Sequence, residues 1–170
     1  MTIYDIYILA IKLGIENDFR GKKEIEHILK RRREHYEKLS QKEKDLFDEE
    51  NLTNPFSDTR ILWPSSAKAI QGKAVKRVMV GIDIGPEEIM LAKQLGGFDL
   101  VISHHPSGKA LAGLDEVMHL QADVLAQYGV PIAVAQSLLR PRIEEVARGI
   151  SPSNHNRTVD VCRLLDVPYI

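Results

Sequence analysis

The chain has 170 residues, of which 44% are apolar, and its 23 basic residues almost balance its 24 acidic ones. The balanced charge argues against a protein that binds nucleic acid through overall basicity, and the apolar fraction suffices for one ordinary core. Cys162 is the single cysteine, so no internal disulfide can form and a reducing, cytoplasmic location is expected. The apolar N-terminal stretch, residues 1–18, is too short to span a membrane and has no signal-peptide pattern.

Residues 1–58 are predicted to form a helical N-terminal extension that ends in a turn-rich linker. Thr2 followed by Asp5, and Ser40 followed by Glu43, are capping-box patterns, in which two residues exchange hydrogen bonds at a helix start. Apolar residues at helical spacing then predict three helices: residues 2–14 with Gly14 as the stop, residues 22–39, and Ser40 to about Asp48.

The second of these helices carries the charged run KRRREHYEK, residues 30–38. A nucleic-acid partner held by Arg31, Arg32 and Arg33 is one interpretation of this run. Residues 21–50 contain nine basic and nine acidic residues, interleaved at helical spacing, which favours a solvated helix face. Nucleic acid is therefore not expected as a partner, whereas a protein partner for the N-terminal helices is a possible role.

Residues 59–170 are predicted to form an α/β domain. A short strand is expected at residues 59–63 and a loop at 65–74, and the near-continuous apolar run within 75–86 predicts a strand buried on both faces. Pro86 suits the first position of the following helix, which turns Ile89, Ala92 and Leu95 inward and ends at Gly96 and Gly97. The strand FDLVIS, residues 98–103, completes a βαβ unit with parallel strands.

The remaining residues predict helices and the beginning of another strand. A helix is expected over residues 114–129, and a second over 131–150 with a kink at Pro141, although VPIAVA also suits a strand. Ser153 or Asn154 can cap a further helix to Leu165, and a strand begins at residues 167–170. The predicted fold is therefore a mostly parallel sheet with a βαβ unit, flanked by helices and preceded by the N-terminal extension.

Two adjacent histidines end the second strand of the βαβ unit, in GGFDLVISHHPSG, residues 96–108. Ligands of α/β proteins bind at the carboxyl ends of parallel strands, so Asp83, His104 and His105 are expected on one rim. Neutral imidazoles bind Zn, Fe, Ni, Mn or Co. Because neighbouring side chains of a strand point in opposite directions, the pair suits two metals, or one metal and a substrate, better than one chelate. Alternatively, one imidazole binds a backbone carbonyl and the other is exposed.

The segments VMVGIDIGPEEIMLAKQLG (78–96) and GFDLVISHHPSG (97–108) resemble the Nif-three-like family, also called the type 2 GTP cyclohydrolase I family. The resemblance covers residues 59 to about 130, and the tetrapeptide SHHP is its most specific part. It implies a centre of two divalent metal ions with His104 and His105 as ligands and Asp83 nearby. It also implies a homo-oligomer of toroidal shape and a metal-dependent hydrolase-like or cyclohydrolase-like enzyme whose substrate stays open.

The chain departs from the family pattern after the HHP turn, residues 104–106. The HTxxD motif of the family is missing, and so are its later His and Glu, which leads us to expect the N-terminal portion of a longer protein. His119 and His155 are possible local substitutes, whereas Cys162 suits the core. The alternative function is a non-catalytic metal-binding interaction or scaffold protein that docks through its N-terminal helices.

Overall fold

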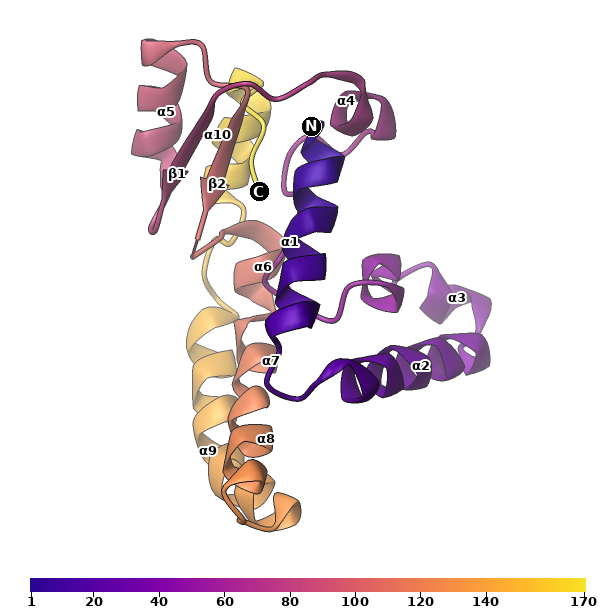
Figure 1. The fold of residues 1–170 in the computed structure, drawn as a ribbon. Helices are drawn as coiled ribbons and strands as arrows, with labels where there is room; N and C mark the ends of the chain where they lie inside the picture. Colours follow the sequence, from indigo (N-terminus) through magenta and orange to yellow (C-terminus); the bar gives the residue numbers. More distant parts are fainter.

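A computed structural model describes residues 1–170 and places two parallel strands between helices that flank them on both sides (Figure 1). The α/β fold with a helical N-terminal extension is therefore confirmed. A long antiparallel pair of helices extends away from the sheet, and the C-terminus lies beside β2 (Figure 1). No helix combines the length and the apolar character that a membrane span requires.

The first helix, α1 (Ile3–Asn17), packs its buried residues Ile3, Tyr7 and Ile11 toward the sheet. Its capping box between Thr2 and Asp5 forms as predicted. The predicted stop at Gly14 is wrong, since the helix continues for three more residues. Gly14 has another reason to lack a side chain, because a Cβ there would lie 2.7 Å from Cε2 of Phe56. The ring of Phe56 therefore packs directly on the helix backbone.

The rest of the N-terminal segment is α2 (Lys22–Lys38), α3 (Gln41–Lys44) and the 3₁₀ helix η1 (Glu49–Leu52). The capping box at Ser40 is confirmed, but α3 ends four residues earlier than predicted. Two arginines of the charged run hold α2 on η1: Arg32 donates to the carbonyls of Asn51 and Asn54, and Arg33 donates to that of Leu52. These two guanidinium groups therefore stabilise the contact between α2 and η1.

The sheet contains β1 (Val78–Gly81) and β2 (Leu100–Ser103), joined by α5 (Pro86–Leu95). The strands run parallel, in a register that pairs Val78 with Leu100 and Gly81 with Ser103, so the predicted βαβ unit is confirmed. Tyr169 extends the sheet beyond β2, because it bridges Val101 in parallel and Trp63 in antiparallel fashion. The predicted strand at residues 59–63 is reduced to that single bridge, and the segment 65–74, predicted as a loop, contains α4 (Ala67–Gly72).

The prediction that the first strand is buried on both faces is wrong. Val80 is 70% exposed and Ile82 61% exposed, because α1 covers the sheet near Val78 and β2 while the outer edge of β1 pairs with no strand. Leu95 is also exposed rather than turned inward, whereas Ile89 and Ala92 are buried as expected. An apolar run in the sequence thus identified the strand but not its position at the edge of the sheet.

After β2 the chain forms five helices, α6 (Gly108–Ala112), α7 (Leu114–Met118), α8 (Leu120–Gln127), α9 (Ile132–Ile150) and α10 (Arg157–Leu165). The helix predicted over 114–129 is divided at His119, and α10 begins a few residues later than expected. Helix α9 is confirmed over the strand alternative, and it contains Pro141 as predicted. In the extended pair of Figure 1, α7 and α8 follow one another on one side and α9 packs along both of them on the other.

The two faces of the sheet carry separate apolar clusters. On one face, residues of α1 pack with Leu100 and Ile170. On the other face, residues of α5 and α10, including Cys162, pack with Val101 and Tyr169. Helix α1 is therefore a layer of the sheet's own core, and the boundary predicted between residues 58 and 59 separates segments that share this core.

Candidate metal site

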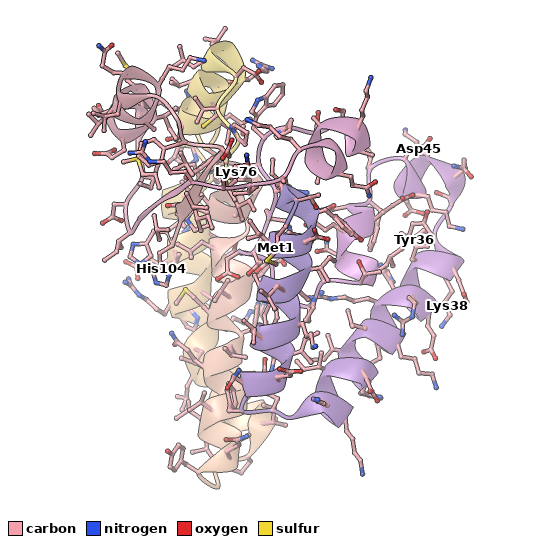
Figure 2. The ribbon with its side chains drawn as sticks, turned by 45° about the horizontal axis from the view of Figure 1, so that its top comes forward. Met1, Tyr36, Lys38, Asp45, Lys76 and His104 are labelled. Carbon is pink, nitrogen blue, oxygen red and sulfur yellow. The ribbon has the colours of Figure 1, made fainter.

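Two backbone hydrogen bonds hold the HHP turn to the end of β1 and the residue after it. The amide of His104 donates to the carbonyl of Gly81 at 2.8 Å, and the amide of His105 donates to that of Ile82 at 2.8 Å. Because the strands are parallel, these residues lie at the end of the sheet opposite to Lys76, which precedes β1 (Figure 2). The backbone therefore fixes where the two histidines leave the sheet.

Asp83 lies in contact with the second histidine. Its Oδ1 is 2.8 Å from Nδ1 of His105, and the two side chains are 82% and 67% exposed. When Nδ1–H of the neutral imidazole donates a hydrogen bond to this carboxylate, the other ring nitrogen, Nε2, keeps its lone pair and is the atom available to a metal ion. Carboxylates orient metal-binding histidines in this way in many metalloproteins.

The ring of His104 lies next to that of His105, with centroids 5.0 Å apart and planes tilted by 40°. The expectation that the two side chains point in opposite directions is therefore wrong. Strand β2 ends at Ser103, and the alternation of side chains holds only within a strand. The two imidazoles can consequently face one site.

Ser103 joins the two loops that carry these side chains, and sequence analysis did not single it out. Its buried Oγ lies 3.0 Å from the carbonyl oxygen of Ile82 and 3.2 Å from that of His105, and it accepts a 3.4 Å hydrogen bond from the amide of Ile84. Ile82 and Ile84 flank Asp83 in the chain. The one signal in the sequence was the position of this serine inside SHHP.

A pocket of about 320 Å³ opens beside Asp83 and His105, and it also involves His155. The Nε2 of His155 is engaged elsewhere, because it lies 2.9 Å from the carbonyl oxygen of Ile150. Across the pocket, Arg157 and Glu87 form an exposed ion pair of 3.6 Å. The pocket therefore offers both charges to a bound molecule.

His119 lies elsewhere, at the junction of α7 and α8. It is exposed and lines two cavities of about 580 and 490 Å³, neither of which includes His104, His105 or Asp83. The structure thus brings Asp83 to His105, brings His155 to the same pocket, and keeps His119 apart.

The donor atoms on this rim match a divalent transition metal in kind but not in number. Imidazole nitrogen and carboxylate oxygen are ordinary ligands of Zn, Fe, Mn, Ni and Co. No group of three or more His, Cys, Asp or Glu side chains in the chain is placed to hold a metal ion. Since a protein site commonly uses three or four such ligands, the residues present fit part of a metal centre and not a whole one.

Neither a protein-family model nor a curated protein matches this chain. A solved structure, described as the crystal structure of a NIF3 superfamily protein from Sphaerobacter thermophilus, is similar to it, with 40% sequence identity and a TM-score of 0.53. The match covers 56% of this chain and 34% of that one, so the chain spans about a third of the length of that protein. The resemblance predicted from the sequence is thereby confirmed over the matched part.

Proposed function

We propose that this chain, which is similar over its matched part to a NIF3 superfamily protein, supplies His104 and His105 as ligands of a divalent-metal site. The observation that carries the proposal is the 2.8 Å contact between Asp83 and His105, at the ends of adjacent parallel strands, with the ring of His104 beside it. Because Nδ1 of His105 is engaged with Asp83, this contact leaves Nε2 as the ring nitrogen that can bind a metal ion.

The expected centre holds two metal ions, and its other ligands come from groups that do not reach the histidine pair within a single copy of this chain. Two histidines and one carboxylate fall short of the six to eight protein ligands that two ions use. A homo-oligomer is one source of further ligands, and additional chain of a longer protein is another. An activity of the hydrolase class would require the completed centre.

The first experiment is a calorimetric titration of the purified chain with Zn²⁺. We expect one binding event that disappears in the variant His104→Ala/His105→Ala. The matched control is His27→Ala/His35→Ala, which removes two exposed histidines of α2 and should bind as the parent does. Equal binding by all three proteins, or none by the parent, would contradict the proposal.

An interaction role is the second candidate, and the exposed apolar residues of α1 favour it. Tyr4, Ile8, Leu9 and Leu13 are exposed although the opposite face of the same helix is buried. We expect these side chains to support self-association, which sedimentation velocity would detect. Ile8→Lys should lower the sedimentation coefficient of the chain, and Lys42→Gln, which changes an exposed residue of α3 outside this surface, should leave it unchanged.

A further inference from the structure

A polar network joins the N-terminal segment to the helix that follows the HHP turn. Glu50, in η1, accepts hydrogen bonds from the phenol of Tyr7 in α1 and from the ammonium group of Lys109 in α6. Its carboxylate also lies 3.5 Å from Nε of Arg60. One side chain thus connects three elements that are far apart in the sequence.

The network is anchored in the interior of the protein. Arg60 is only 3% exposed and donates to Oδ1 of Asn51 at 2.7 Å, and the buried Asn54 donates to the phenol oxygen of Tyr7 at 3.1 Å. Burial, and then the neighbouring carboxylate of Glu50, raises the pKa of Tyr7, so its phenol remains a hydrogen-bond donor. No buried side-chain nitrogen or oxygen in the chain lacks a partner, which makes the network costly to open.

Helix α6 begins three residues after His105. The amide of Gly108, its first residue, donates to the carbonyl of His155 at 2.7 Å, and the next residue, Lys109, reaches Glu50 and lies 3.5 Å from Asp48. Residues 104–107 therefore connect two segments that are each held by hydrogen bonds. One is the strand ends and the other is α6. The position of α6 decides the path of the turn between them.

We propose that Glu50 and Lys109 are positioning residues of the HHP turn, through which the N-terminal segment holds His104 and His105 in place. This proposal rests on the proposed function only in assuming that the turn binds a metal ion. The contacts of Glu50 and Lys109 themselves lie within the chain. It gives the N-terminal segment a role at the site that its own residues do not enter.

The test measures amide hydrogen exchange by NMR on the metal-free full chain. The amides of His104 and His105 report on the turn, and the amide of Val101, which donates to the carbonyl of Pro168, reports on the sheet. In Lys109→Met we expect exchange of the two histidine amides to accelerate by about tenfold or more, with that of Val101 unchanged. Lys109→Arg keeps the cation and should restore slow exchange.

Lys93→Met is the matched control, because Lys93 likewise joins two elements through its ammonium group, which donates to the carbonyl of Leu165 far from the turn. It should leave the histidine amides unchanged. Glu50→Gln is a second test and should act as Lys109→Met does. Unchanged exchange at His104 and His105 in Lys109→Met, or an equal acceleration at Val101, would overturn the proposal. Because no metal is present, this result is independent of whether the chain binds Zn²⁺.

Discussion

Asp83 and His105 follow two neighbouring parallel strands and meet at the end of the sheet, with Oδ1 and Nδ1 2.8 Å apart. Both side chains are largely exposed, so the contact adds at most about 1 kcal/mol to folding. Asp83→Ala should therefore leave the urea midpoint of the chain almost unchanged. Because the carboxylate orients the imidazole, the same change should weaken Zn²⁺ binding by about 10–100-fold in a calorimetric titration.

The control for this prediction is Asp160→Ala, which removes an equally simple surface contact, the 3.0 Å ion pair of Asp160 with Arg163. It should affect neither stability nor Zn²⁺ binding. A clear loss of stability in Asp83→Ala would show that the carboxylate serves the fold. Undiminished Zn²⁺ affinity would show that it does not orient His105.

Gly108 is predicted to be the glycine near the site that tolerates substitution least. Its φ of +65° is costly for a residue with a side chain, and a Cβ would lie 2.9 Å from Cγ2 of Val159. In Gly108→Ala, the left-handed backbone should lower the free energy of unfolding by about 1–2 kcal/mol. Overpacking should lower it by about 1–3 kcal/mol more. Gly129 has a φ of +90° but open space around it, so Gly129→Ala should lose only the backbone part. Equal unfolding free energies of the two variants, measured in urea, would contradict the packing argument.

Asp99 is predicted to make the chain sensitive to acid. Hydrogen bonds from the Lys73 ammonium group and from the amides of Lys76 and Arg77 lower the pKa of Asp99 to about 2. A lowered pKa stabilises the fold above the unfolded value of 3.8, and this stabilisation is lost as the pH falls toward 2. The parent should exceed Asp99→Asn in urea midpoint at pH 6, and the difference should shrink by pH 2.5. A difference that is independent of pH would contradict the role of the carboxylate charge.

Cys162 is predicted to be inert in the folded chain. Its side chain is fully buried in the cluster between α10 and the sheet, and burial raises the pKa of the thiol to about 12. Since the thiolate is the reactive form, a disulfide reagent at pH 8 should modify Cys162 only after urea unfolds the protein. Rapid modification without denaturant would mean that α10 leaves the sheet easily.

Much of the local structure followed from the sequence, because short-range chemistry determines it. Both capping boxes depend on residues three positions apart, and both form where Thr2 and Ser40 predicted them. The βαβ unit followed from an apolar run, a proline at a helix start and a second apolar run. The topology of parallel strands was then enough to bring Asp83 and the histidines to one end of the sheet. Gly14 misled the prediction because its reason for being glycine is the ring of Phe56, 42 positions away in the sequence.

The sequence by itself therefore determined the long helices, the βαβ unit and which end of the sheet carries the histidines. Only the tertiary structure decided that the rings of His104 and His105 lie side by side, that β1 is an exposed edge, and that Glu50 reaches Lys109. The physical reason is the range of the interactions. Caps and helical stripes are settled among near neighbours, whereas ring orientation, burial and the Glu50 network depend on segments that meet only when the chain has folded.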